Sequence, residues 1–483
     1  MLSARLFEDV EYTGTLPETE ITAVTNDSRR VQPGSVFVCT VGRTSDGHRY
    51  AQKALDAGAA LVVTERPLGL AREVTVKNGR EAYARLCSAF FDHPGRKLRL
   101  VAVTGTNGKT TVTTVIKQIL EAAGHRVGLI GTIHTMLDTM ELPAKYTTPE
   151  AWDLQMLLAK MAAMGCDCAV MEASSQALDQ LRLFGLRFEV GVFTNLTQDH
   201  LDYHGTMEQY FAAKASLFAH CETVIYNKDD TWAARLPQLY PACRCIGFSE
   251  SDQTADYTAH NVQLSPGGVA FTLVGHRSIQ KIRFPMPGTF SVQNAMAAAV
   301  CALQMGVTPE RVVTALAASA GVCGRSEVLY DGLFTVICDF AHTGDGIEKI
   351  LSGLRPFARQ RLIVLFGCAG DRDAAKRPDM ARSAMWYGDY IILTSDNPRS
   401  EDPAAIAADV EPLLREGGVP YTVELERRRA VRRALEMAQP GDVVVLCGKG
   451  HEDYQVIDGV TIYLDEHRIV RDWLRDRGLL KEI

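Results

Sequence analysis

Short apolar runs alternate with turn clusters and helical stretches through most of this 483-residue chain. Near the N-terminus, runs at 35–41 and 60–64 are separated by turn-forming residues such as 45–47. This pattern predicts a small α/β domain over residues 1–95, which ends in a linker of Pro, Gly and basic residues at 93–97.

A second set of buried-strand candidates follows at 168–172, 189–194 and 223–227, with helical stretches such as 151–164 between them. Strands that alternate with helices of this length are typical of a mostly parallel sheet. We therefore expect a central α/β domain over residues 96–325.

A third set begins after a break near 320–324, and each apolar run is followed by polar turn residues and a predicted helix. The runs are 334–340, 361–367, 389–394 and 442–448. They predict a Rossmann-like, doubly wound domain over residues 326–483. The expected fold class is thus α/β with three domains, a central P-loop-type one and a C-terminal Rossmann-like one.

One glycine-rich turn carries the clearest chemical signal. The apolar residues Val101–Val103 lead into Gly105-Thr-Asn-Gly-Lys-Thr-Thr111 and then into a predicted helix. Glycines let the amides approach phosphate, a lysine reaches the terminal phosphates and a threonine hydroxyl binds Mg²⁺. Val103 stands where the full P-loop pattern has glycine, and a plain glycine turn with an incidental lysine is the alternative. The predicted ATP contacts here are Gly105, Thr106, Asn107, Gly108, Lys109, Thr110 and Thr111.

Composition excludes several classes of protein. The formal net charge is −7, which provides no basic field for nucleic acid. Acidic residues interrupt the N-terminus before an apolar run forms, and no run approaches the roughly 20 apolar residues of a membrane span. The 12 cysteines show no C-x-x-C pair, so we interpret them as reduced thiols of a cytoplasmic protein.

Further polar clusters follow the central strands. Glu172 ends one strand and suits Mg²⁺, which prefers hard oxygen ligands. His200 and His204 follow the next, although helix-surface or hydrogen-bonded core histidines are the commoner explanation of such a pair. Lys214 lies in a helical stretch, where a solvated lysine is the simple interpretation.

The C-terminal strands also end in polar turns, at 370–373, 396–399 and 448–452. Pro398 makes the second turn rigid, so that Arg399 could bind a carboxylate, unless it is only a solvated turn arginine. With Arg372 and Glu452 at the same sheet edge, these turns predict a pocket for a zwitterion.

Together these motifs resemble the Mur ligases of peptidoglycan synthesis, over residues 22 to 473. The matching segments are GTNGKTT (105–111), Glu172 with its Ser-Ser run, NLTQDHLDYHG (195–205), YFAAKASLF around Lys214, DFAHT (339–343), GDRD (370–373), DNPR (396–399) and GKGHE (448–452).

The resemblance implies an ATP-dependent ligase of cell wall biogenesis. In this family the γ-phosphate of ATP activates the D-Glu carboxylate of UDP-N-acetylmuramoyl-L-Ala-D-Glu, and an amine then attacks the acyl phosphate. The partners are these small molecules, and we expect a cytoplasmic monomer that uses Mg²⁺. The implied roles are UDP-sugar binding for 1–95, ATP binding for 96–325 and amino-acid binding for 326–483.

Site residues follow from the resemblance position by position. The implied catalytic residues are Lys109, Lys214, Glu172 and His200. Mg²⁺ ligands are Thr110, Glu172, His200 and Lys214 as a carbamate. Further nucleotide contacts are Asn294, Arg325 and Asp339. Contacts to the UDP-muramoyl-dipeptide are Ser28, Arg43, Thr44, Ser45, Thr147, Thr148, Ser174, Gln180 and Arg182. The amino-acid site comprises Arg372, Asp396, Asn397, Pro398, Arg399, Gly448 and Glu452.

Arg399 favours meso-diaminopimelate as the amino acid, because lysine lacks the distal carboxylate that an arginine would bind. Three positions depart from the family pattern: Gln176 replaces a histidine, Gly344 replaces a proline and Tyr146 occupies a variable position. The alternatives are a lysine-adding or other Mur ligase, a folylpolyglutamate-type ligase, a generic P-loop ATPase and an inactive binding paralogue. The ligase interpretation requires the loop at 105–110 and the turn at 396–399 to face one cleft.

Overall fold

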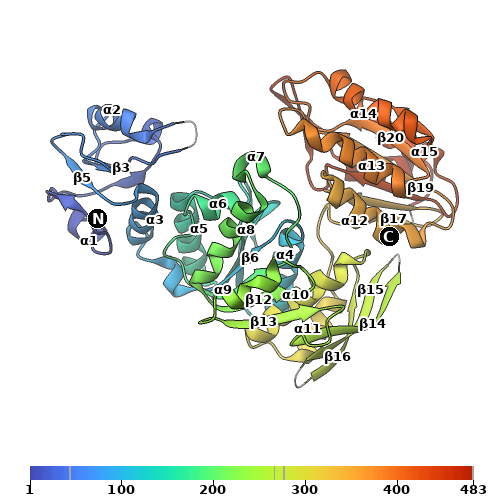
Figure 1. Cartoon of the computed structure of the whole chain (residues 1–483), viewed down its shortest axis with the longest axis horizontal. Helices are drawn as coiled ribbons and strands as arrows, with labels where there is room; N and C mark the ends of the chain where they lie inside the picture. The colour runs from blue at the N-terminus through green and yellow to red at the C-terminus, as the bar shows by residue number, and fades with distance from the viewer. Residues whose placement is uncertain (43–44, 266, 276–277, 481–483) are drawn as a thin grey trace. The chain divides into compact units, whose positions relative to one another are not determined.

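The computed structural model describes residues 1–42, 45–265, 267–275 and 278–480. The chain divides into two compact units (Figure 1). The first comprises Met1–Phe248 with Val300–Val307, and the second comprises Ser249–Ala299 with the chain from Thr308 onward. The predicted boundaries of three domains stay a prediction.

The N-terminal part of the first unit is a sheet with strand order β1-β5-β4-β3-β2, parallel except for β1. Its strands are β1 (Thr13–Gly14), β2 (Ala23–Thr25), β3 (Ser35–Val38), β4 (Leu61–Thr64) and β5 (Glu73–Thr75), and its helices are α1 (Ser3–Leu6), α2 (Ala51–Asp56) and α3 (Gly79–Phe90). The side chain of Asn78 caps α3 by accepting the amides of Arg80 and Glu81. The apolar runs at 35–41 and 60–64 contain β3 and β4, and the predicted α/β character of this part is confirmed.

The rest of the first unit is built on strands in the order β13-β12-β11-β6-β10-β7-β8-β9. The strands are β6 (Arg99–Thr104), β7 (Val127–Ile130), β8 (His134–Leu137), β9 (Met140–Pro143), β10 (Cys168–Glu172), β11 (Phe188–Phe193), β12 (Cys221–Asn227) and β13 (Arg244–Ser249). The helices are α4 (Lys109–Ala122), α5 (Ala151–Ala163), α6 (Ser175–Asp179), α7 (Leu201–His204), α8 (Met207–Ala215) and α9 (Leu236–Leu239). The predicted mostly parallel sheet is confirmed, with antiparallel pairing confined here to β7-β8-β9.

Strand order explains why distant motifs meet. β6 lies between β10 and β11 and runs parallel to both, with Val103 opposite Glu172 and Thr104 opposite Phe193. The glycine loop, the Glu172 turn and the segment after β11 therefore emerge at one edge, where open parallel sheets bind ligands.

The second unit begins with an antiparallel meander of β14 (Tyr257–Ser265), β15 (Gly268–Gly275) and β16 (Ser278–Phe284). Two helices follow, α10 (Phe290–Gln304) and α11 (Pro309–Ala317). The meander was not expected from the sequence.

The C-terminal sheet has strand order β17-β18-β22-β19-β20-β21, parallel except for β17. Its strands are β17 (Glu327–Asp331), β18 (Thr335–Asp339), β19 (Leu362–Cys368), β20 (Tyr390–Ser395), β21 (Tyr421–Val423) and β22 (Val443–Cys447), followed by β23 (Tyr454–Ile457) and β24 (Val460–Tyr463). The helices are α12 (Gly344–Leu354), α13 (Arg377–Tyr387), α14 (Pro403–Gly417), α15 (Arg427–Met437) and α16 (Glu466–Asp476).

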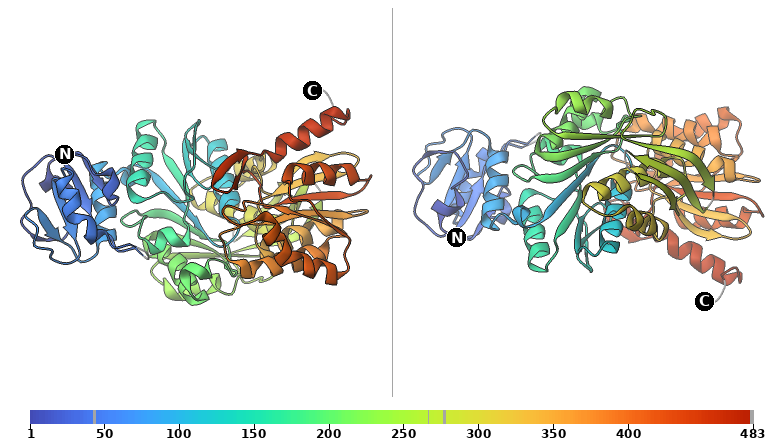
Figure 2. Two further views of the ribbon diagram at one scale, coloured as in Figure 1. Left: turned by 90° about the horizontal axis from the view of Figure 1, so that it is seen from above. Right: turned by 90° about the horizontal axis from the view of Figure 1, so that it is seen from below.

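Alternate residues of β19 face opposite layers of this doubly wound fold. Val364 and Phe366 pack with α12, α13 and α14, whereas Ile363 and Leu365 pack with α15 and α16. Figure 2 shows helices on both faces of the C-terminal sheet and of the central sheet. The predicted Rossmann-like architecture is confirmed.

One element prediction is wrong. The strand at 442–448 is followed by the β23-β24 hairpin before α16, and not directly by a helix. Asp458 and Gly459 form its turn with φ of +47° and +72°, and an Asp-Gly pair between short strands is a hairpin signal that the sequence does contain.

Gly344, which replaces a family proline, has a packing explanation. It begins α12, and a Cβ there would lie 2.9 Å from the Cβ of Asp379 on α13. None of the helices in the described segments is both long and apolar enough to cross a bilayer.

Candidate functional site

The glycine loop begins where β6 ends. The backbone φ is +142° at Gly105 and +84° at Gly108, values that residues other than glycine rarely adopt. A Cβ on Gly105 would lie 1.9 Å from Oγ1 of Thr194, so this position requires glycine. Because α4 starts at Lys109, the loop carries a helix N-terminus, which favours a bound anion.

Two lysines converge on one carbonyl of this loop. Nζ of Lys109 donates to the oxygen of Gly105 at 3.0 Å and to that of Thr106 at 2.8 Å. Nζ of Lys214, from α8, donates to the same Gly105 oxygen at 2.7 Å. The predicted catalytic lysines are thus within reach of the same loop although 105 residues separate them in the sequence.

Lys214 is 1% exposed, so the interpretation as a solvated lysine is wrong. Its Nζ lies 4.7 Å from the centre of the Tyr210 ring. Burial, and after it the charge of Lys109, hold the pKa of Lys214 well below its usual range. A neutral buried amine is a nucleophile, which is the property that carbamate formation requires.

Glu172 ends β10 and is also 1% exposed. Its Oε1 accepts the amide of Thr132 at 2.8 Å, and its Oε2 accepts the Thr132 hydroxyl at 3.0 Å. The same hydroxyl lies 3.0 Å from Oγ1 of Thr147, a predicted dipeptide contact. Thr132 therefore orients the carboxylate, and sequence reasoning missed it because it lies in the turn between β7 and β8 and belongs to no motif.

The two histidines of the 195–205 motif have different surroundings. His204 is buried, with Nε2 2.9 Å from Oγ of Ser175, which is the hydrogen-bonded core histidine of the alternative interpretation. His200 has a φ of +52° and precedes α7, and its side chain is half exposed beside Asp199. His200 is therefore the more exposed of the two, whereas His204 lines the larger cavity described below.

The other dipeptide candidates form a connected set. The Thr148 hydroxyl donates to the carbonyl of Glu172 at 2.7 Å and accepts the amide of Ser174 at 3.0 Å. Arg182 donates to the carbonyl of Thr148 at 2.8 Å and to Oε1 of Gln180 at 2.7 Å. These four predicted residues are brought together beside Glu172.

A narrow cavity of about 10 Å³ joins this set to the N-terminal sheet. It is lined by Asn26, Thr40, Arg80, Tyr83, Glu150, Ala151, Gln180, Leu181 and Arg182. Ser28 lies two residues beyond Asn26 in a 3₁₀ turn, and Ser45 lies in an exposed loop. Arg43 and Thr44 lie outside the described residues.

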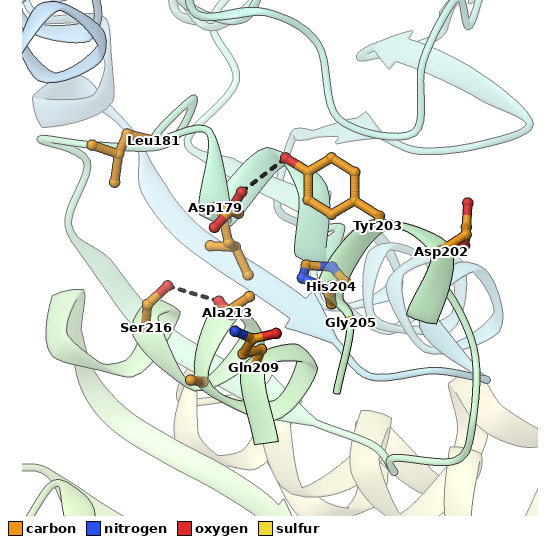
Figure 3. Close-up of a pocket in the computed structure, with 11 residues that line it drawn as sticks. Asp179, Leu181, Asp202, Tyr203, His204, Gly205, Gln209, Ala213 and Ser216 are labelled. Carbon is orange, nitrogen blue, oxygen red and sulfur yellow. Dashed lines mark hydrogen bonds between the residues drawn. The ribbon is translucent and has the colours of Figure 1, made fainter. Parts of the chain in front are cut away.

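A larger cavity of about 790 Å³ opens beside α6, α7 and α8 (Figure 3). The hydroxyl of Tyr203 donates to Asp179 at 2.8 Å at its wall. As described, its lining includes none of the four predicted catalytic residues, although Lys214 lies on α8 and His200 directly precedes α7.

The remaining nucleotide candidates belong to the second unit. Asn294 is buried on α10, and Asp339 ends β18. The carboxylate of Asp339 accepts the amides of Ser326 and Ala341, each at 2.7 Å. Burial raises the pKa of Asp339, although the nearby charge of Arg325 opposes this effect. The guanidinium of Arg325 lies 4.5 Å from the centre of the Phe340 ring.

In the C-terminal sheet, the ends of β19, β20 and β22 meet as predicted. Asn397 is buried, and its Nδ2 donates to Oε2 of Glu452 at 3.0 Å. Its Oδ1 accepts the amide of Val456 at 2.9 Å and Nζ of Lys449 at 3.2 Å. Asn397 thus joins the turns after β20 and β22.

Arg399 is held in place by its backbone and by its side chain. Its φ is +54°, its amide donates to the carbonyl of Val456 at 3.0 Å, and Nη1 donates to the carbonyl of Gly370 at 2.6 Å. Gly448 leaves no room for a Cβ, which would lie 2.6 Å from Oδ2 of Asp396. Pro398 is buried, whereas Arg372 is exposed at the same edge.

Sequence reasoning missed two ion pairs that involve buried residues here. Lys449 is fully buried and forms an ion pair with Glu452. Arg427 and Glu466 form a 2.8 Å ion pair with both side chains inaccessible to solvent, and Arg427 also donates to the carbonyls of Ser395 and Cys447. The position of Lys449 beside Gly448 in the GKGHE segment is the signal that could have identified it.

The loop at 105–110 lies in the first unit and the turn at 396–399 in the second. That they face one cleft stays a prediction.

Comparison with protein families gives three matches. The family models described as Mur ligase family, catalytic domain, Mur ligase middle domain, and Mur ligase, glutamate ligase domain match residues 20–91, 103–302 and 324–450.

Similar proteins cover nearly the whole chain. A UDP-N-acetylmuramoyl-L-alanyl-D-glutamate–2,6-diaminopimelate ligase from Geobacillus thermodenitrificans is 42% identical, over 95% of this chain and 96% of the relative. A solved structure of a ligase with the same description has a TM-score of 0.73 at 33% identity and covers 99% of both chains. A folylpolyglutamate synthase from Mycobacterium tuberculosis has a TM-score of 0.62 at 19% identity and covers 75% of this chain and 91% of the synthase, a likeness of fold alone. With its glycine loop, its buried lysine and this near full-length similarity, the chain belongs to the Mur ligase family.

Proposed function

We propose that this protein joins meso-diaminopimelate to UDP-N-acetylmuramoyl-L-Ala-D-Glu at the expense of ATP. An oxygen of the D-Glu carboxylate attacks the γ-phosphorus, the bond to the β-phosphate oxygen breaks, and ADP leaves. The amine of diaminopimelate then attacks the acyl carbon. The tetrahedral intermediate expels phosphate, the nitrogen loses a proton, and an amide remains.

The observation that carries this proposal is the convergence of Lys109 and the buried Lys214 on the carbonyl of Gly105. A simple phosphate-binding loop needs only one lysine, which contacts the terminal phosphates of the nucleotide. A second amine whose pKa is lowered by burial is less suited to bind phosphate as a cation, but in its neutral form it can form a carbamate with CO₂. The carbamate is an anion that suits a metal site.

The residues around the loop fit Mg²⁺. Glu172 supplies a carboxylate oriented by Thr132, Thr110 supplies a hydroxyl at the start of α4, and Lys214 supplies two further oxygens once carbamylated. His200 completes the set. When bound, Mg²⁺ neutralises the negative charge of the phosphate oxygens. Lys109 and the amides of Thr106 to Thr111 hold the transferred phosphate in line with the carboxylate.

We assign the three parts of the chain to three substrates. Residues 1–95 bind the UDP-sugar through Ser28 and residues 43–45, and residues 96–325 bind ATP and the dipeptide. Residues 326–483 bind the amino acid. We assign Asn294, Arg325 and Asp339, which belong to the second unit, as further contacts to the nucleotide.

Selectivity for diaminopimelate rests on the rigid corner at Arg399. The backbone amide of Arg399 is held by the carbonyl of Val456. Its guanidinium donates to the carbonyl of Gly370, and this hydrogen bond can be replaced by one to the distal carboxylate of diaminopimelate. Glu452, paired with Lys449 and Asn397, supplies the anion for the ammonium group. Lysine has no distal carboxylate and would leave Arg399 without this ligand.

Because the reaction consumes ATP and a nucleotide-sugar precursor, we place the protein in the cytoplasm, and we expect it to act as a monomer. The cysteines of the described residues are free thiols, in keeping with that compartment.

One incubation tests the function. The full chain is supplied with ATP, Mg²⁺ and UDP-N-acetylmuramoyl-L-Ala-D-Glu, and diaminopimelate, lysine and ornithine are offered in parallel. Mass spectrometry should find the amide only, or by far the fastest, with diaminopimelate. Preferential use of lysine would make the chain a lysine-adding ligase, and ADP release at full rate without any amine would make it a simple ATPase.

A further inference from the structure

A cluster of metal-ligating side chains lies outside the proposed ligase site, within the second unit. Cys323 precedes the first strand of the C-terminal sheet, Glu327 begins that strand, and His467 lies in the first turn of α16. The three come from segments that are 140 residues apart in the sequence.

The ligand atoms of this cluster are close together. Nε2 of His467 lies 2.8 Å from Oε2 of Glu327 and 3.8 Å from Sγ of Cys323, and all three atoms lie within 4.8 Å of one another. Tetrahedral Zn²⁺ with bonds of about 2.0–2.3 Å places neighbouring ligand atoms about 3.3–3.6 Å apart. Small rotations of the side chains would bring the cluster to that spacing.

The residue types indicate which metal fits. A thiolate and an imidazole together select borderline or soft ions, and a single carboxylate does not suit Ca²⁺ or Mg²⁺, which require several oxygens. Cys323 is exposed, whereas Glu327 and His467 are half-buried. Three protein ligands on the rim of the domain leave a fourth position for water.

A second observation supports a metal at this point. Oδ1 of Asp465 lies 3.5 Å from the other ring nitrogen of His467, the carboxylate–histidine arrangement that orients metal-binding imidazoles.

The backbone fixes the Cys323 segment. Gly324 has a φ of +64°, and a Cβ there would lie 2.1 Å from the amide nitrogen of His451. The amide of Gly324 donates to the same Oε2 of Glu327 at 2.6 Å. The thiol is therefore presented by a segment with little freedom to move.

A similar group of His125, Asp167 and Cys168 in the first unit is less suited to a metal. Burial, and then the charge of Asp167, raise the pKa of the Cys168 thiol to about 12, which opposes the thiolate that a metal needs. Its histidine and aspartate serve as a comparison for the test.

We propose that Cys323, Glu327 and His467 form a Zn²⁺ site, with Asp465 positioning the imidazole. The proposed site requires no substrate of the ligase reaction, although Arg325, a proposed nucleotide contact, lies between Cys323 and Glu327 in the sequence.

The test uses the full chain, reduced with a phosphine and titrated with Co²⁺ as a spectroscopic probe. A thiolate-to-cobalt charge-transfer band should grow to one equivalent and disappear when Zn²⁺ is added. Cys323→Ser and His467→Gln should abolish the band, whereas Cys243→Ser and His125→Gln should retain it. Asp465→Asn keeps a side chain that can cap α16 but loses the charge behind the imidazole, so it should weaken binding about tenfold or more.

A measurement on the unaltered protein does not depend on how the variants fold. Zn²⁺ should slow alkylation of Cys323 by iodoacetamide, read by peptide mass spectrometry, and leave the half-buried Cys243 unaffected. The proposal is overturned if no band forms, if the band persists in Cys323→Ser, or if Cys323 is alkylated equally fast with and without Zn²⁺.

Discussion

In the proposed ligase, selectivity for diaminopimelate depends on one side chain, that of Arg399. Replacing it by alanine removes one charge-assisted contact to the distal carboxylate, equivalent to about 1.5–3 kcal/mol or a 10- to 150-fold lower kcat/KM for diaminopimelate. Steady-state kinetics measure this loss. Arg382→Ala, on an exposed helix face, serves as the control, and an unchanged kcat/KM in Arg399→Ala would refute the assigned role.

Lys214 gives a second prediction at this scale, on pH. Because burial holds its pKa well below the usual value, the amine is neutral and open to CO₂ down to that lowered pKa, and becomes protonated below it. In CO₂-depleted buffer, activity should therefore fall as the pH drops below the pKa of Lys214, and it should recover when bicarbonate is added.

The variant Lys214→Ala should lose about 10²–10³ in kcat and regain part of it when a short carboxylic acid is added. Lys160→Ala, on the exposed side of α5, should behave as the unaltered protein. Full activity of Lys214→Ala without added acid would show that no carbamate is needed.

Individual residues differed in how far the sequence could predict them. Gly105 and Lys109 follow from the loop pattern alone, because their roles depend on local backbone geometry. The burial of Lys214 does not, because it arises from the packing of α8 against Gly105, which lies 109 residues earlier in the sequence. The orientation of Glu172 by Thr132 could not be predicted either, because it depends on the pairing of β10 with β7.

At the scale of elements, a buried ion pair links α15 and α16. Glu466→Gln would leave the guanidinium of Arg427 buried without its counter-charge and should lower the free energy of unfolding by about 3–5 kcal/mol. Urea unfolding measures the change. Glu436→Gln, which alters an exposed pair with Arg477, should change it by less than about 1 kcal/mol, and equal effects of the two variants would contradict the argument.

The start of β22 gives a pH-dependent prediction. Burial alone would raise the pKa of Asp442, but hydrogen bonds from the Arg361 side chain and from the amides of Gln439 and Arg361 outweigh it and lower the pKa. A lowered pKa stabilises the folded state at pH values above the pKa of the unfolded state, which is near 3.8. That stabilisation is lost as the pH falls through the pKa of the folded state.

Asp442→Asn should therefore lower the free energy of unfolding by about 1–3 kcal/mol at pH 7, and the difference from the unaltered protein should shrink in acid below the unfolded pKa. Denaturant titrations at several pH values measure this difference. A difference that stays constant into strong acid would show that Asp442 contributes nothing through its charge.

Elements that form a continuous apolar run were predictable. The strand expected at 168–172 is β10 to the residue, because every one of its side chains is buried. The meander β14–β16 and the hairpin β23–β24 were missed, since these strands are partly exposed and mix polar with apolar residues. Such strands form through pairing with their neighbours, which a local pattern does not reveal.

At the scale of the whole molecule, the account requires two units to cooperate. The first carries the phosphate loop and the second carries the amino-acid turns, so neither alone can complete the reaction. The resemblance to the Mur ligases implied three domains with three roles, and that division stays a prediction. The sequence could not predict the proposed Zn²⁺ site, because its ligands share no motif and meet only through the fold of the second unit.

The central claim, that ATP activates a carboxylate for attack by an amine, is tested most directly by isotope transfer. UDP-N-acetylmuramoyl-L-Ala-D-Glu labelled with ¹⁸O in the D-Glu side-chain carboxylate is turned over with ATP, Mg²⁺ and diaminopimelate, and the released phosphate is analysed by mass. An acyl phosphate requires one ¹⁸O atom in the inorganic phosphate for each amide formed. Unlabelled phosphate, or label in AMP, would contradict the account.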